Sequence, residues 1–417
     1  MNVNNLSKLL QAGFHISLGA TGFLAQLLQE PQELADDLTR IQQRPDQLLQ
    51  DLAVQGKNME RDAFNFLKTY FSPSNQRSQY PKYIESDDEQ AFNQPYEIKG
   101  TKMYGFVLEA SISKLQELCD KYLNEPANGT ITYRPVTHYI ILTLNDIDSL
   151  SSVESPGYNK GIISEQEAIF WVLTAAGKQQ GPFFTVERLG WFMPFVYVNN
   201  SPILVSGREV YGFFKQLSEL KIPKIDQEPD LFTIDALVFK KFSPTTNARD
   251  SRLLEIRRIS QGDNHKSIKT WDSFEEIVTE IVRLLFDSNG NIDIPGLELP
   301  LNLLHYLFER DVPMVTLKQF RDVEDSRRAC YQAIVEFLMQ LQTYHRGKIL
   351  GFDKFGDQFE LIVNNFASQP IVQSLGLYPG LSPGGELAHV PIKLAFLLNF
   401  DFIVENGTIV WQASQRG

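Results

Sequence analysis

One lysine, Lys215, stands among apolar residues in the segment with the clearest chemical signal. Its neighbours include Tyr211, Phe213, Phe214 and Leu217. A free lysine has a pKa of about 10.4, so only about one side chain in 2,500 carries a neutral amine at pH 7. Burial disfavours the charged form, and a neutral amine can attack a carbonyl carbon to form a Schiff base. The alternative is a lysine whose stem covers apolar surface while its charged end stays in water.

The residues around this lysine follow an ordered pattern. An aromatic-rich run precedes Asn-Asn-Ser-Pro at 199–202, a second apolar run leads to Gly-Arg-Glu at 207–209, and Lys215 follows. This segment resembles the signature of the acetoacetate decarboxylase family, in which a lysine is the activated nucleophile. The resemblance covers about residues 96–417, and it implies that Lys215 forms a Schiff base with the substrate.

Flanking segments extend the resemblance. Residues 103–124 are similar to the family's first strand and helix, and residues 317–331 and 399–411 are similar to its C-terminal strands and helix. The resemblance implies an α+β fold, mainly an antiparallel β-barrel with flanking helices. It also implies a homo-oligomer and a reaction that needs no metal or organic cofactor.

The resemblance places further residues in the site. Registration with the family puts a pocket glutamate at Glu165, which would orient the substrate or transfer a proton. Glu167 has the same strand parity and should face the same side. Arg208, in the Gly-Arg-Glu corner, and Phe214, beside the lysine, are expected to contact the substrate. The alternative for Glu165 and Glu167 is a pair of surface glutamates at the start of a strand.

Three departures from the family pattern bear on the substrate. Gln216 occupies the position where the family member best known for this chemistry has a second lysine, so burial alone is left to activate Lys215. The family's pocket arginine registers near Thr101, and Lys102 is the nearest cation for a substrate carboxylate, although lysine is a less selective anchor than arginine. The family's pocket has a second glutamate, which aligns near residues 138–139, and this sequence has no glutamate there.

The resemblance therefore implies decarboxylation of a small β-keto acid through an imine on Lys215. Trp171, Trp191 and Phe214 are candidates for a dry pocket wall, with core packing as the alternative role for each. Two other functions stay open. One is a Schiff-base aldolase or dehydratase acting on a larger keto acid, which the changed pocket residues favour. The other is a non-catalytic barrel that binds a ligand, which Gln216 and the missing glutamate favour.

Other catalytic and cofactor-binding motifs are absent from the sequence. It contains no P-loop, no G-x-G-x-x-G after a strand, no H-E-x-x-H and no G-x-S-x-G. Its six histidines are scattered, and its two cysteines, Cys119 and Cys330, are far apart. We therefore expect neither a metal site nor a disulfide framework.

The apolar pattern divides the chain into three parts. Residues 1–72 show a period near 3.6 and are expected to form helices that self-associate or pack on the barrel. Residues 73–95 have no period and are predicted to be a linker. Residues 96–417 are expected to form the β-barrel domain, with a helical insertion at about 265–310.

Within the third part, short β-rich runs alternate with turn residues. The predicted strands are 103–108, 137–144, 167–174, 192–198, 231–239, 253–259, 315–319, 359–364 and 396–410. The predicted helices are 111–123, 271–286 and 329–344.

Composition and charge restrict the function classes. The 417 residues are 43% hydrophobic and carry a formal net charge of -12. Such an acidic surface repels phosphate backbones, so nucleic-acid binding is not expected. The first residues lack the basic start of a signal peptide, and the most apolar early stretch, 13–28, is too short to span a bilayer. We expect a cytoplasmic protein without a membrane span, with a small-molecule keto acid as its partner.

Overall fold

The computed structural model describes residues 81–87, 90–180, 183–224, 227–260, 270–271, 311–352, 355–356, 358–381 and 385–413. The predicted helical region at 1–72 lies outside these residues, as does the predicted insertion at 265–310 except for residues 270–271. Of the predicted linker, residues 81–87 and 90–95 are described, and they belong to no helix or strand.

Strands make up most of the described chain. They are β1 (Tyr96–Glu109), β2 (Thr132–Pro135), β3 (Tyr139–Ser152), β4 (Ile163–Gln180), β5 (Phe183–Val198), β6 (Lys215–Lys221), β7 (Leu231–Val238), β8 (Arg249–Ser260), β9 (Thr270–Trp271), β10 (Asp311–Arg321), β11 (Ala329–Phe352), β12 (Phe355–Gly356), β13 (Gln358–Asn364), β14 (Leu387–Pro391), β15 (Leu394–Val404) and β16 (Thr408–Gln412). Each predicted strand overlaps an observed one.

The helical segments within the described residues are short. They are α4 (Ile112–Cys119), η2 (Asp120–Asn124), α5 (Glu125–Ala127), η3 (Gly157–Lys160), α6 (Ser201–Ser206), η4 (Gly207–Tyr211) and α9 (Ile371–Leu375). The helix predicted at 111–123 is confirmed as α4 continued by η2. In this part of the chain, no helix is long and apolar enough to cross a membrane.

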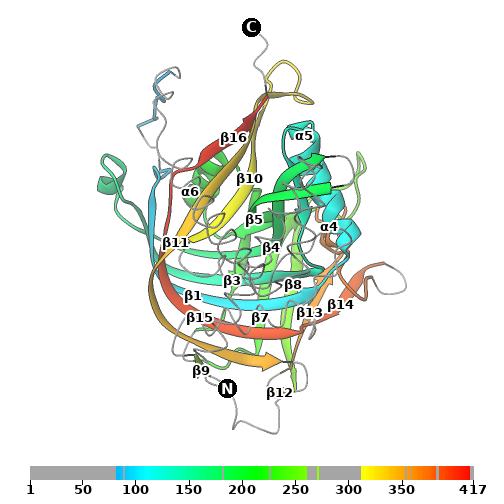
Figure 1. Cartoon of the computed structure of the whole chain (residues 1–417). Coiled ribbons are helices and arrows are strands. Elements are labelled where there is room, and N and C mark those ends of the chain that lie inside the picture. Colours follow the sequence, from blue (N-terminus) through cyan, green and yellow to red (C-terminus); the bar gives the residue numbers. More distant parts are fainter. Residues whose placement is uncertain are drawn as a thin grey trace, which may run out of the picture.

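Seven strands pair in a closed circuit, which we call the strand circuit. β5 pairs with β10, which is followed by β11, β15, β1, β3 and β4, and β4 pairs again with β5. All of these pairings are antiparallel except β5–β10. Figure 1 shows β1, β15 and β11 running side by side along one part of the circuit.

A second row of strands, β6-β7-β8-β13-β14, extends from β5 through a parallel pairing of β6 with β5. The sheet is therefore mixed. The predicted fold is confirmed as mainly β with few helices, whereas the mainly antiparallel barrel is confirmed only in part.

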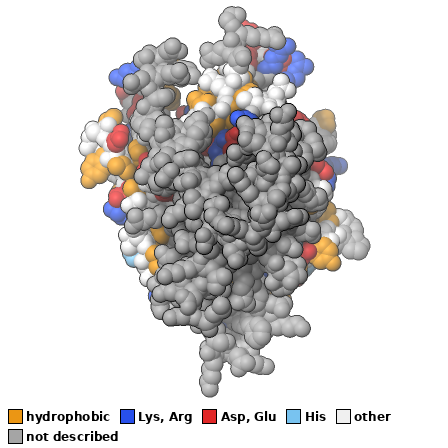
Figure 2. All heavy atoms as spheres, viewed as in Figure 1, with side chains coloured by type: hydrophobic (Ala, Val, Ile, Leu, Met, Phe, Trp, Pro, Cys, Tyr) orange, Lys and Arg blue, Asp and Glu red, His pale blue; other side chains and the backbone are white. Residues whose placement is uncertain are grey.

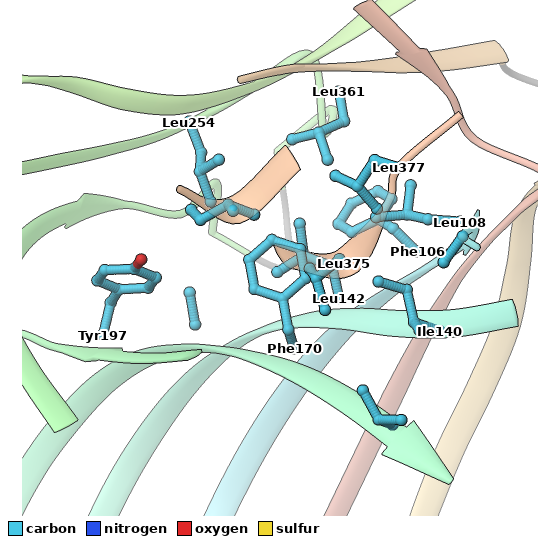
Figure 3. Packing of buried hydrophobic residues seen from close by; sticks show 14 of the residues in the cluster. Phe106, Leu108, Ile140, Leu142, Phe170, Tyr197, Leu254, Leu361, Leu375 and Leu377 are labelled. Atoms are coloured by element: carbon cyan, nitrogen blue, oxygen red, sulfur yellow. The ribbon is translucent and has the colours of Figure 1, made fainter. Parts of the chain in front are cut away.

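The circuit strands bury both of their faces. In β4, Phe170 belongs to one apolar cluster and the next residue, Trp171, belongs to another. The first cluster joins the circuit to the second row of strands. Figure 3 shows Phe170 pointing toward the layer that carries Leu254 of β8 and Leu361 of β13. The second cluster lies inside the circuit and surrounds the candidate site described below.

The helix predicted at 329–344 is wrong, because these residues lie in strand β11. β11 pairs with β10 along one edge and with β15 and β16 along the other. Its β-branched residues Ile334 and Val335 are both buried and belong to opposite clusters. A strand buried on both faces has a nearly continuous apolar run, which periodicity cannot distinguish from a buried helix. Of the helix predicted at 271–286, only Trp271 is described, and it lies in β9.

Charged side chains of both signs lie on the described surface. Figure 2 shows Lys and Arg side chains close to Asp and Glu side chains at the edges of the face in view. Several of these charges pair, as in the ion pair between Lys240 and Glu386, whose side chains are both 72% exposed. Exposed pairs of this kind contribute little to stability.

Candidate functional site

A cavity of about 70 Å³ lies inside the strand circuit. All seven circuit strands contribute to its described lining, together with α6, η4 and the first residue of β6. Because one water needs about 10–15 Å³ of such space, the cavity can hold a small organic molecule. Among the described lining residues, the charged side chains are Lys215, Glu165 and Glu167.

The lysine amine lies between the two carboxyl groups. Lys215 is 8% exposed, and its Nζ donates a hydrogen bond to Oε1 of Glu165 at 3.2 Å. Oε2 of Glu167 lies 3.7 Å from the same nitrogen. The ring of Phe213 lies on the amine, with its centroid 5.6 Å from Nζ. The structure thus brings together three of the residues that the sequence places in the site, in a nearly dry environment.

The alternation of side chains along the strands and the register between strands explain why Lys215 lies beside the two glutamates. Glu165, Glu167 and Trp171 have the same parity in β4, and all three line the cavity. β5 lies between β4 and β6, with Val196 paired to Ile169 on one side and to Lys215 on the other. The lysine and the carboxylates therefore come from two strands that flank the same central strand, with their side chains on the same face.

The turn before Lys215 is built by local capping. The side chain of Asn200 accepts a hydrogen bond from the backbone N–H of Ile203 at 3.0 Å and begins α6. The chain continues as η4, and this helical turn ends at Gly212, whose φ of +85° is in the left-handed region. A Cβ atom there would lie 2.4 Å from Cα of Lys318, so this position requires glycine. The first residue of the strand that follows is Lys215, two residues beyond Phe213.

Two residues of the Gly-Arg-Glu corner hold the lysine in place. A Cβ atom on Gly207 would lie 2.6 Å from Cδ and 2.8 Å from Cε of Lys215, so the lysine stem rests directly on the glycine. Nη1 of Arg208 donates to the backbone carbonyl of Lys215 at 3.1 Å. The motif therefore positions the lysine through Gly207, which lines the cavity, and through Arg208, which is not among the described lining residues.

We expect Gly207→Ala to lower any activity that depends on Lys215 by about 10- to 100-fold, because the new methyl group displaces the lysine stem by a fraction of an ångström or more. Gly207 has an ordinary helical φ of -66°, so stability should change by less than about 1 kcal/mol. Steady-state kinetics and urea unfolding measure the two effects. The control is Glu209→Ala, at an exposed position of the same turn. Full activity of Gly207→Ala would show that the lysine stem does not need this contact.

Asn145 is a site residue that the sequence did not reveal. It is 2% exposed, lines the cavity and pairs directly with Glu167 across β3 and β4. Its Nδ2 donates to Oε1 of Glu167 at 2.9 Å, which orients that carboxyl group toward Lys215. Its Oδ1 is buried without a hydrogen-bond partner among the described residues. Only the register of β3 against β4 could have indicated this asparagine.

Lys102 lies outside the cavity, contrary to the prediction that it binds the substrate. Ile98 and Met103 both line the cavity although they differ in parity, because a bulge at Gly100, with φ +67°, shifts β1 against β15. The bulge turns Lys102 to the opposite face, where its Nζ bonds Oδ1 of Asp148 at 2.7 Å. Without that bulge, Lys102 would share the parity of Ile98.

Arg208 and Phe214 are also not among the described residues that line the cavity. Arg208 is exposed and acts on the lysine backbone. Phe213 lines the cavity in place of Phe214, whose ring packs on Tyr122 at 5.0 Å between centroids, on the other side of the chain. The sequence could not assign the parity of a residue just before a strand begins.

Gln216 points away from the amine as well. Tyr197 and Gln216 both bond the side chain of Gln369, in the cluster between the circuit and the second row of strands. Because neighbouring strand residues face opposite ways, the residue after Lys215 can act on the amine only at a distance. Of the tryptophans expected in the wall, Trp171 lines the cavity. Trp191 packs edge-on against Trp171, with 6.1 Å between the ring centroids.

Burial dominates the electrostatics of Glu165. It raises the pKa of this carboxyl group to about 8, against the opposing effect of the Lys215 charge and with a smaller upward contribution from Glu167. Within the described residues, no group of three or more His, Cys, Asp or Glu side chains is placed to hold a metal ion.

Comparisons with known proteins reveal only distant likenesses. No protein-family model matches the sequence, and no curated protein matches it either. The acetoacetate decarboxylase of Legionella pneumophila is similar in structure, with a TM-score of 0.48 and 13% identity over 83% of this chain and 96% of that chain. An acetoacetate decarboxylase-like enzyme from Sphingomonas wittichii has a TM-score of 0.44 and 10% identity, over 80% and 99% of the two chains.

The enduracididine biosynthesis enzyme MppR, in a complex with pyruvate, has a TM-score of 0.43 and 9% identity, over 82% of this chain and 97% of that chain. At scores this low, the function has to be inferred from the residues of the site.

Proposed function

We propose that this chain is a cofactor-independent carboxy-lyase that decarboxylates a small β-keto acid through a Schiff base on Lys215. The observation that carries the proposal is a buried lysine amine that bonds a buried carboxyl group inside a mostly apolar cavity. A lysine in such a place serves covalent chemistry on carbonyl compounds. The strand circuit would then be the barrel of an acetoacetate decarboxylase-like fold.

The hydrogen bond between Lys215 and Glu165 provides a route to the nucleophile. Transfer of one proton from Nζ to Oε1 converts the ion pair into a neutral amine beside a neutral carboxyl group. Burial favours this uncharged pair, since each charged form loses its hydration inside the protein. The raised pKa of Glu165 makes its carboxylate a stronger base for the transfer.

The reaction then needs only this amine, this acid and water. Nζ attacks the ketone carbon, water leaves, and a protonated imine forms. The bond between the α-carbon and the carboxylate breaks, its electron pair moves through the α-carbon to the iminium nitrogen, and carbon dioxide departs. The resulting enamine takes a proton on the α-carbon, for which Glu165 is the nearest buried acid to the nitrogen. Hydrolysis of the imine releases a ketone and regenerates the lysine.

Glu167 and Asn145 have supporting roles in this scheme. The Glu167 carboxyl group, held by Asn145, faces the nitrogen from 3.7 Å and can stabilise the positive charge of the protonated imine. The unpartnered Oδ1 of Asn145 can accept a hydrogen bond from the hydroxyl group that the amine addition creates.

Borohydride trapping tests the proposal directly. The purified full chain is mixed with 3-oxobutanoate and sodium borohydride, and the adduct is located by peptide mass spectrometry. We expect one stoichiometric reduced adduct on Lys215, together with release of carbon dioxide in the absence of borohydride. Lys240→Ala, which removes an exposed lysine, is the matched control and should trap equally well. A ligand-binding barrel without catalysis would yield no adduct at Lys215, and that result would refute the proposal.

A further inference from the structure

Four of the chain's six methionines line the one cavity described above. They are Met103, Met193, Met314 and Met339. The other two methionines lie outside the described residues. Methionine is thus the side chain that distinguishes this cavity from the rest of the described interior, where the cores are built of other apolar residues.

The four methionines come from four strands of the circuit, β1, β5, β10 and β11. Met314 pairs with Phe337, two residues before Met339, so these two methionines are diagonal neighbours on the same face of β10 and β11. The polar side chains Asn145, Glu165 and Glu167 come from β3 and β4. In the circuit β5 separates β4 from β10, while β15 and β1 separate β11 from β3. The methionine pair therefore lies across the cavity from the polar groups.

A methionine wall has particular physical properties. Its side chains are unbranched and polarisable, they adapt to irregular apolar shapes, and they occur at binding surfaces that accept several ligands. Met193 and Met314 are almost fully buried, at 1% and 3% exposure, whereas Met103 and Met339 are partly exposed. Met103 pairs with Asn145 and lies beside the polar groups, so we use the name methionine wall for Met314 and Met339 alone. This wall is a deformable apolar surface across the cavity from the polar cluster.

We infer that the substrate carries an apolar chain on the side of its ketone remote from the carboxylate, and that the methionine wall binds this chain. This inference rests on the proposed Schiff-base function. The carbonyl carbon lies at Lys215, the substrate carboxylate lies on the polar side near the amine, and the alkyl chain extends toward Met314 and Met339. An amphiphilic 3-oxo acid with a short alkyl chain matches this division of the cavity better than one with a polar tail.

A substrate series on the wild-type chain tests this inference. The compounds are 3-oxo acids with methyl, ethyl, propyl and pentyl chains, and a fifth in which a hydroxyl group replaces the terminal methyl of the propyl chain. We expect kcat/KM for carbon dioxide release to rise about fourfold for each methylene from methyl to propyl, the factor that corresponds to burial of one methylene. The hydroxylated compound should lose at least about tenfold relative to the propyl compound.

Variants of one methionine locate the effect. Met314→Gln keeps the length of the side chain and adds a polar amide, and it should reduce the preference for propyl over the hydroxylated chain by about fivefold or more. Met314→Leu keeps the wall apolar and should retain the preference within about twofold. Leu237→Ala, at an exposed position outside the cavity, is the control and should leave the series unchanged.

The outcomes separate the two hypotheses. A flat chain-length series, or equal rates for the hydroxylated compound, with adducts still forming on Lys215, would overturn the apolar-chain inference and leave the Schiff-base proposal intact. If no compound forms an adduct on Lys215 and none loses carbon dioxide, the proposed function fails, and the inference fails with it. A rising series that Met314→Gln flattens supports both.

Discussion

Lys215→Gln is expected to lower kcat/KM for β-keto acid decarboxylation by at least about 10⁴-fold and to abolish the borohydride adduct, because no other group can form the imine. Among the residues that line the cavity in the described part of the chain, Lys215 carries the only amine. Initial rates over a range of substrate concentrations, and mass spectrometry after borohydride reduction, measure the two effects. If Lys215→Gln retained more than about a hundredth of the wild-type rate, the Schiff-base mechanism would have to be abandoned.

The same substitution should alter stability in a pH-dependent way. It leaves the carboxyl groups of Glu165 and Glu167 buried without their counter-charge, and breaking a buried pair in this manner costs about 3–5 kcal/mol. The loss should be small in acid, where the carboxyl groups are protonated, and should grow as the pH rises. The double variant Lys215→Gln with Glu165→Gln removes one of these charges and should regain most of the stability. An inactive but stable double variant then shows that lost activity is not unfolding.

Glu165→Gln is expected to lower kcat/KM by about 10²- to 10³-fold, since it removes the buried acid that exchanges protons with the amine. The pH profile distinguishes this role from simple packing. Burial raises the pKa of Glu165 to about 8, so the wild-type rate should fall above about pH 8 as the proton donor is lost. The variant has no titrating group at this position, and its profile should lack that alkaline decline. If the rate of the variant still declined at alkaline pH as the wild-type rate does, the decline would belong to another group.

Stability should report the same titration with a definite sign. The folded-state pKa of Glu165, about 8, lies above its ordinary value of 4.5, so the folded chain binds this proton more tightly than the unfolded chain does. The contribution of Glu165 to stability is therefore complete below about pH 4.5 and is lost as the pH rises through about 8. The free energy of unfolding of Glu165→Gln relative to wild type should rise over that range and level off above it. Urea unfolding at several pH values measures this difference.

The two largest expected effects concern residues that the sequence identified. Lys215 drew attention as one cation in an apolar run, and the resemblance of its segment to the acetoacetate decarboxylase signature made it the predicted nucleophile. Glu165 was predicted by registration with the family, and Glu167 was added because it has the same strand parity as Glu165. Parity is an inference that spacing within a single segment is sufficient to support.

Three predicted site residues lie elsewhere than the sequence indicated, two of them because the regular alternation of strand faces is interrupted. Lys102 was expected in the pocket, but the bulge at Gly100 reverses its face. Phe214 was expected to contact the substrate, but Phe213 lines the cavity, because the chain before β6 is not yet a regular strand and its parity is undefined there. Arg208 was expected to contact the substrate, yet it holds the backbone of Lys215. A single extra residue in a strand exchanges the two faces, and apolar spacing does not reveal such an insertion.

The amino-acid sequence by itself determined that the chain from residue 96 onwards is mainly β, and that one lysine and two glutamates are the chemically distinctive groups. Only the tertiary structure decided that strands far apart in the chain close into a circuit, which makes β11 a strand where its apolar run also suited a helix. Tertiary structure likewise placed Asn145 opposite Glu167 and gathered four methionines from four strands around one cavity. The physical reason is that periodicity along a segment records which face is buried, whereas pairing register and ring closure are set by contacts between segments.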